Sequence, residues 1–201
     1  MNLLTMPLQQ YASVTMRMVT RSAETRSPYT GRQQVHVWPG GWWEADIEFM
    51  PIPDRDAAED LIGWLAALDG RRNRFMLQHP VHPGPRGTMG AHSPRVDGGG
   101  QTGSTLVVGG VPAGTTMLRG DRFQVSYPPR LHMVTADTVA DGSMRMALPI
   151  WPRLRVSPAH NESVWPWLPH ATMMLADPVM EHTITAATTY GLRLRCVEDL
   201  R

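Results

Sequence analysis

The chain has 201 residues, enough for one large or two small domains with a buried core. Its formal net charge of +1 provides no strong field for DNA or an anionic membrane, so we expect no specific nucleic-acid binding. Lysine is absent, which excludes Schiff-base, lysine-nucleophile and P-loop lysine chemistry. The single Cys196 excludes an internal disulfide and is typical of a protein made in a reducing cytoplasm. No leader pattern is present and no apolar run approaches the roughly 20 residues of a membrane helix, so we expect neither export nor membrane insertion.

Alternating apolar and polar residues predict strands in the N-terminal quarter. Residues 14–19 predict a first strand, and the polar stretch 20–32 is expected to be a long loop. Residues 33–38 and 43–49 also alternate, and Pro-Gly-Gly at 39–41 predicts a tight turn joining them as a hairpin. Large aromatic residues beside a turn favour packing or an interface. We therefore expect a group of residues here to contact another subunit or partner: Arg32, Trp38, Trp42 and Trp43.

One helix is predicted over residues 54–69. Asp56 and Glu59 have the spacing of a capping box, and Gly70 stands where a left-handed helix end is expected. The apolar residues of the segment form one stripe: Leu61, Ile62, Leu65 and Leu68. A short buried strand is predicted at 75–77.

The remaining chain predicts more strands in two groups. Residues 79–103 are rich in Pro, Gly and His and indicate a long excursion or domain junction. Beyond it, short strands at regular intervals predict a small barrel of the OB or SH3 kind: 105–108, 122–125, 131–136 and 144–150. C-terminal strands are expected to complete the first sheet: 173–175, 183–189 and 190–197.

The predicted fold is therefore mainly β with one main helix. A discontinuous first domain, 1–87 plus 156–201, is expected to be a split β-sandwich-like unit, and a small β-barrel domain, 88–155, is inserted into it.

Three groups of residues resemble a metal site, a phosphate-binding loop or an acid–base pair, but lack the neighbouring residues that such sites need. His79, His82 and His92 have no neighbouring Cys or carboxylate, so we expect solvated loop histidines rather than a metal site. The glycine-rich segment 97–103 lacks the lysine and the following helix of a phosphate loop. Hairpin turns explain three aspartates better than acid–base catalysis does: Asp121, Asp137 and Asp141. We expect no catalytic, metal or cofactor site.

Trp165 and Trp167 permit a weaker hypothesis, a glycan contact, because exposed aromatic faces stack on sugars. Packing within the fold or at a subunit interface is the favoured interpretation of the tryptophans in general.

Three segments together resemble known tail proteins of tailed bacteriophages and prophages: SPYTGRQQVHVWPGGWWEADIEF, then GDRFQV…RLHMVTAD…DG…LPIWPRLR, and the closing YGLRLRCVEDL. The layout is similar to that of the distal tail protein at the tail tip of long-tailed phages (siphophages).

That resemblance implies a structural protein of the virion tail, assembled in the bacterial host cytoplasm and not an enzyme. It implies a β-rich ring domain that forms a hexameric ring on the tail tube and an outer barrel of the OB type in some members. The expected partners are further copies of the chain, the tail tube protein, and hub, fibre or receptor-binding proteins used in host attachment. The alternatives are a carbohydrate-binding module of a tail or cell-surface assembly and, with no credible catalytic pair, a wall-degrading enzyme.

Overall fold

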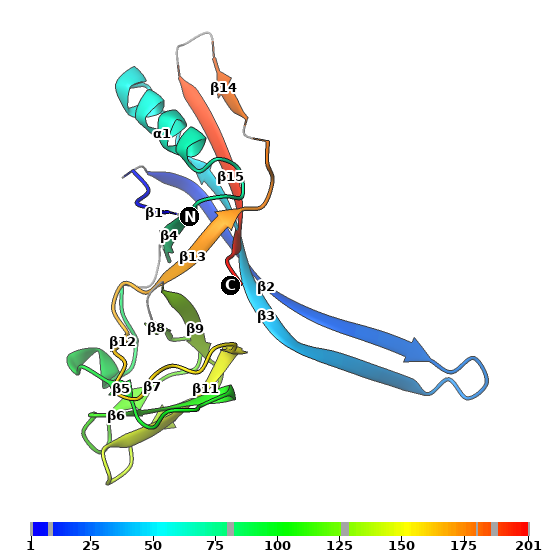
Figure 1. Cartoon of the computed structure of the whole chain (residues 1–201), viewed down its shortest axis with the longest axis vertical. Helices are drawn as coiled ribbons and strands as arrows, with labels where there is room; N and C mark the ends of the chain where they lie inside the picture. Colours follow the sequence, from blue (N-terminus) through cyan, green and yellow to red (C-terminus); the bar gives the residue numbers. More distant parts are fainter. Residues whose placement is uncertain are drawn as a thin grey trace.

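A computed structural model describes residues 2–7, 10–79, 83–125, 129–179, 181–185 and 189–200. The described chain is mainly β, as the sequence predicted, and its strands form two curled sheets with one α-helix beside the first (Figure 1). Each sheet has its own cluster of buried apolar side chains.

The first sheet has seven strands, in the order β1-β4-β13-β15-β3-β2 with β14 beside β15. Their bounds are Leu3–Leu4 (β1), Tyr11–Arg26 (β2), Gln33–Phe49 (β3), Arg74–Gln78 (β4), His170–Leu175 (β13), His182–Ile184 (β14) and Tyr190–Glu198 (β15). β1 is parallel to β4, and the other pairs are antiparallel. Because β13 and β15 lie between β4 and β3, the C-terminal strands complete the N-terminal sheet, which confirms that expectation.

Helix α1, Arg55–Ala67, packs on one face of this sheet. Asp54 caps it, its side chain accepting a hydrogen bond from the Asp56 N–H at 3.2 Å, in place of the predicted Asp56–Glu59 box. The predicted left-handed residue Gly70 has φ +59°. The buried stripe of the helix also includes a tryptophan that the sequence pattern missed: Leu61, Trp64, Leu65 and Leu68.

The second sheet has six strands, in the order β12-β8-β9-β11-β6-β5, and curls into a nearly closed barrel. Their bounds are Arg95–Val96 (β5), Gly103–Gly109 (β6), Arg122–Val125 (β8), Arg130–Val134 (β9), Arg145–Leu154 (β11) and Val164–Trp165 (β12). A separate pair joins Thr116–Met117 (β7) to Thr138–Val139 (β10), and Thr88–Ala91 forms a short 3-10 helix. Because β12 pairs with β8, this sheet extends past residue 155, where the sequence placed the boundary.

The predicted hairpin around residues 39–41 is wrong. β3 runs without a turn from Gln33 to Phe49, and its partner is β2, whose residues 20–26 fill most of the expected loop. The pairing shifts between Thr20↔Gly41 and Ser22↔Val37, so Pro-Gly-Gly lies at a bulge. Proline without an N–H and glycine without a side chain fit a bulge as well as a turn, and pairing with a distant strand decided between them.

Trp43 joins the two sheets. Its ring is only 1% exposed and meets the ring of Trp151 edge-on, with centroids 4.7 Å apart. Its Nε1 donates a hydrogen bond to the Leu131 carbonyl at 3.0 Å, and the Arg122 guanidinium lies 5.6 Å from its ring centroid. Trp43 was expected to contact another subunit, and that expectation is wrong, because its side chain is enclosed by β8, β9 and β11 of the same chain.

Gly41 permits the close approach of the two sheets at this junction. A Cβ there would lie 2.8 Å from Trp151 ring atoms, closer than real contacts allow, whereas a Cβ on the neighbouring Gly40 would meet nothing within 4 Å.

We predict that Gly41→Ala lowers the free energy of unfolding by about 1–3 kcal/mol, because the Trp151 ring must shift within a packed junction. Gly40→Ala is the matched control and should change it by less than about 0.5 kcal/mol. Urea unfolding of both variants measures the difference. Equal effects of the two substitutions would contradict the packing of Trp151 on Gly41.

Candidate assembly interface

The most distinctive surface of the molecule is the outer half of the β2–β3 hairpin. Near the body, β3 pairs on its other side with β15 at residues 44–48, whereas residues 20–38 pair only within the hairpin and project away from the body (Figure 1). We call residues 20–38 the arm. A turn closes it, with the Gly31 N–H bonded to the Ser27 carbonyl at 3.0 Å. The strands of the arm extend roughly 20 Å at 3.3 Å per residue.

Both faces of the arm are open to solvent. Every residue from Thr20 to Trp38 is exposed except the half-buried Ser27, and Tyr29 at the tip is 96% exposed. Val35, Val37 and Trp38 are also exposed, although they are apolar. A free two-stranded ribbon with open edges is only marginally stable and invites pairing with another chain. The arm therefore has the physical properties of a docking element.

The arm is basic and contains one aromatic pair. Arg21, Arg26 and Arg32 are opposed by a single acid, Glu24. The rings of His36 and Trp38 meet edge-on, with centroids 4.9 Å apart. At the arm base, Arg21 lies over the Trp42 ring at 5.3 Å, and Trp42 Nε1 donates to Glu44 Oε1 at 3.0 Å.

The four predicted contact residues do not form one cluster. Arg32 lies at the exposed arm tip, Trp38 and the half-buried Trp42 line a groove of ≈ 770 Å³ at the arm base, and Trp43 is buried in the junction. Tyr29 was not among the predicted contact residues, because its polar neighbours predict a loop and only the tryptophans form an aromatic cluster in the sequence.

A ladder of ion pairs holds the base of the arm on the polar face of the first sheet. Asp46 on β3 pairs with Arg17 on β2 and with Arg195 on β15, and Arg193 on β15 pairs with Glu48 at 2.8 Å. The hydrogen bond that Asp46 accepts from Arg17 is the main reason that the pKa of Asp46 lies below its usual range. Each exposed pair contributes little alone, so the ladder sets the register of three strands more than the overall stability.

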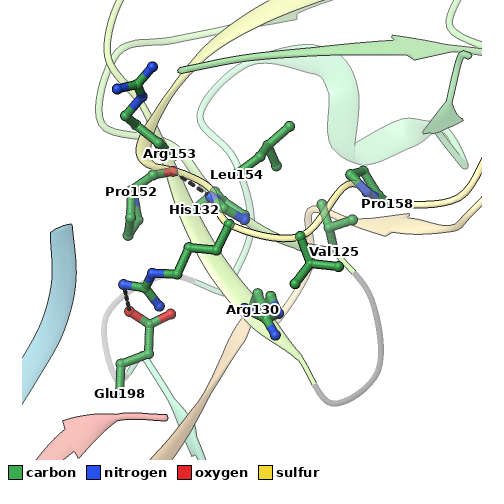
Figure 2. Close-up of a pocket in the computed structure, with 10 residues that line it drawn as sticks. Val125, Arg130, His132, Pro152, Arg153, Leu154, Pro158 and Glu198 are labelled. Atoms are coloured by element: carbon green, nitrogen blue, oxygen red, sulfur yellow. Dashed lines mark hydrogen bonds and ion pairs between the residues drawn. The ribbon is translucent and has the colours of Figure 1, made fainter. Parts of the chain in front are cut away.

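The junction between the sheets contains a small polar pocket (Figure 2). Glu198 accepts a hydrogen bond from the Trp43 backbone N–H at 3.0 Å and lies 3.7 Å from Arg155, which donates to the Gly41 carbonyl. The neighbouring His132 ring nitrogen lies 2.9 Å from the Pro152 carbonyl oxygen. The pocket volume is ≈ 10 Å³, about one water molecule, so the pocket suits a structural junction rather than a substrate.

Burial shifts the pKa values of Glu198 and His132 so that each neutral form is favoured. It raises the pKa of Glu198 to about 7, although Arg155 and the Trp43 N–H oppose the change. It lowers the pKa of His132 to about 4, so this imidazole is neutral at physiological pH. The carboxyl of Glu198 thus titrates in the junction between the two sheets, beside Trp43.

The other residues that imitate chemistry lie apart. His79 is buried rather than solvated, His92 is half-buried, and His82 lies outside the described residues. In the described part of the chain, no three His, Cys, Asp or Glu residues form a group that could hold a metal ion. In the glycine-rich segment, Gly98 and Gly100 have positive φ, as turns require.

The three aspartates have different roles. Asp141 lies in a tight turn, as predicted, and accepts from the Ser143 N–H at 2.8 Å. Asp121 is buried, and hydrogen bonds from the backbone N–H groups of Leu118 and of the distant Arg86 and Gly87 outweigh the effect of burial, so its pKa is lowered. Asp137 accepts from the Arg119 N–H at 2.7 Å, 18 positions away. A hairpin turn therefore accounts for Asp141, whereas Asp121 and Asp137 join segments that are distant in the sequence.

The chain matches no protein-family model, and no curated protein matches its sequence. Within the described ranges, no helix is long and apolar enough to cross a bilayer.

We predict that Glu198 makes stability depend on pH between about 4.5 and 7. A carboxyl with a pKa raised from 4.5 to about 7 keeps its proton in the folded chain and loses it in the unfolded chain across this window. The free energy of unfolding of the wild type relative to Glu198→Gln should therefore fall as pH rises, by at most about 3 kcal/mol.

Denaturant unfolding at several pH values measures this difference. Glu24→Gln, which removes one carboxylate from the exposed arm, is the control for the loss of a charge. Parallel pH profiles of wild type and Glu198→Gln would contradict the assignment.

Proposed function

We propose that this chain is a structural subunit of a phage tail tip, of the distal tail protein type, whose copies form a ring through their arms. The observation on which this proposal depends is the arm itself. The 19 residues of the arm project from the folded chain with both faces open to solvent, and none of them is buried within its own subunit.

The resemblance to phage tail proteins supports this proposal, because its longest segment overlaps the arm. Ser27–Phe49 comprises the arm tip and the whole of β3, which includes Trp43 at the junction. The second and third segments fall on β8 to β11 and on β15, which support β3 in the body. The resembling segments therefore include residues 27–38 of the arm and strands that support it.

The proposed role is assembly rather than turnover. An arm that leaves one side of the subunit can dock on a different surface of the next copy, a heterologous contact that closes into a ring when the rotation allows. Six copies would surround an axial channel for DNA between the tail tube and the hub, fibre or receptor-binding proteins. Such a seam is stabilised by apolar burial and strand-edge pairing and requires no catalytic group.

We predict that removing the arm abolishes assembly and leaves the body folded. Residues 21–40 are replaced by Asn-Gly, which joins the directly paired Thr20 and Gly41 by a two-residue turn. Light scattering should show an oligomer for the wild type and a monomer for the shortened chain, with matching far-UV circular dichroism after allowing for the lost strands. A wild type that stays monomeric at high concentration, with or without tail partners, would refute the proposed function.

One observation favours a second candidate, glycan binding by the barrel. Trp165 on edge strand β12 and Trp167 are 43% and 54% exposed. Trp167 packs over Gly84 and Gly90 and donates from Nε1 to the Gly90 carbonyl at 2.5 Å, so its ring is held in place while much of it faces solvent. A fixed, exposed ring is suited to stacking.

For this candidate, we predict that Trp165→Ala reduces binding to purified host cell-wall polysaccharide, whereas Trp38→Ala, at an exposed tryptophan on the arm, leaves it unchanged. Sedimentation with the polysaccharide measures both. No binding by the wild type would exclude this role.

A further inference from the structure

Given the proposed ring, the surface that receives the arm should also be present on this chain. Grooves of several hundred Å³ lie on the body, and their charges differ. The groove at the arm base is lined by Arg21, Arg71 and Arg155, which would repel a basic arm tip. The groove on the polar face is lined by arginines that already pair with Glu48, Asp46 and Asp177.

A third groove, at the start of helix α1, has the opposite character. Its walls are mainly apolar and its volume is ≈ 480 Å³; the apolar lining is Met50, Pro51, Ile52, Pro53 and Ala57, and the polar lining is Gln10 and Asp54. We call it the α1 groove. Met50 is 47% exposed, so part of its apolar surface is open to solvent.

The helix beside this groove is acidic. Asp54, Asp56, Glu59 and Asp60 are all exposed, and Arg55 is the one basic residue between them. None of the ion pairs among the described residues involves these four acids. The partial positive charge at the helix N-terminus, about half an elementary charge, stabilises some of this negative charge, but it cannot neutralise four carboxylates.

The arm tip has the complementary properties. Tyr29 is 96% exposed at the end of the turn, and an aromatic ring presented in this way is the usual anchor of a docking contact. Arg26 ends β2 on one side of it, and Arg32 lies directly before β3 on the other. Arg26 donates to the Gly31 carbonyl at 3.3 Å, and neither arginine forms an ion pair within the described chain. The arm tip, an aromatic ring between two arginines, is therefore complementary to the α1 groove, which is mainly apolar and lies beside acids without ion-pair partners.

No subunit can fill its own α1 groove. β3 begins at the arm tip and ends at Phe49, directly before the groove, so the two sites lie at opposite ends of one 17-residue strand, on the order of 50 Å apart. Figure 1 shows the arm and α1 extending from the body in different directions. A contact between them therefore joins two copies head to tail, the arrangement that builds rings.

We propose that the arm tip of one copy docks in the α1 groove of the next, with Tyr29 in the groove and Arg26 and Arg32 against the acids of the helix. This inference rests on the proposed ring function and names the receiving surface. Exposed ion pairs contribute little individually, so Tyr29 provides affinity while the charges orient the arm and exclude other grooves.

Site-directed cross-linking tests the contact in the full-length chain. Thr30→Cys labels the tip and Ala57→Cys labels the groove, and the only native thiol, Cys196, is buried. A short thiol-reactive cross-linker should join the double variant into a ladder of multimers that stops at the ring size, and neither single variant should form the ladder.

Charge exchange provides a second measurement. Arg26→Glu with Arg32→Glu should weaken self-association about tenfold or more, and adding Asp56→Arg with Asp60→Arg should restore most of it. Asp177→Arg with Glu181→Arg is the matched control, because this pair makes the same charge change beside the groove on the polar face and should not rescue. Thermal unfolding of each variant verifies that the helix remains folded.

The outcomes separate this inference from the proposed function. An oligomer whose Thr30→Cys variant links tip to tip, or whose double variant gives no ladder, overturns the docking contact and leaves the ring intact. A chain that is monomeric by light scattering and gives no cross-link overturns both.

Discussion

The structure depends on the burial of Trp43 between the two sheets. Its indole extends from β3 across the junction, contacts Trp151 edge-on and donates to the Leu131 carbonyl. Because Gly41 lacks a side chain, Trp151 can approach the strand closely, and Arg155 binds the Gly41 carbonyl from the other side. This contact fixes the direction in which β2 and β3 leave the body, and therefore the direction of the arm.

The two halves of β3 therefore have different surroundings on either side of Gly41. Below Gly41, Trp43 is buried against the barrel and the following inward residues of β3 lie in the core beside α1, whereas the outward Asp46 and Glu48 join the ion-pair ladder. Above Gly41, apolar and basic side chains face solvent on both sides. A stable body with an exposed arm is consistent with the proposed assembly role, in which the arm would gain its missing contacts from another copy.

Much of the secondary structure followed from local pattern. Short strand-like segments at regular intervals located β6, β8, β9 and β11, alternation located β15, and apolar spacing located α1. One strand of the arm was predicted and the other was not. Residues 33–38 alternate and were predicted as a strand, whereas residues 20–26 are polar and exposed, so only their pairing with β3 distinguishes them from a loop.

The candidate site divides in the same way. The sequence by itself determined that aromatic and arginine residues concentrate between residues 21 and 43, that lysine chemistry is absent, and that the fold is mainly β with one helix. Only the tertiary structure decided which of those aromatics face solvent: Trp43 is buried, whereas Trp38 and Tyr29 are exposed. Exposure depends on which distant strands cover a residue, and β9 and β11, about 90 to 110 positions along the chain, cover Trp43. Such long-range packing leaves no trace in local spacing, so only the tertiary structure distinguished the buried junction at Trp43 from the exposed arm.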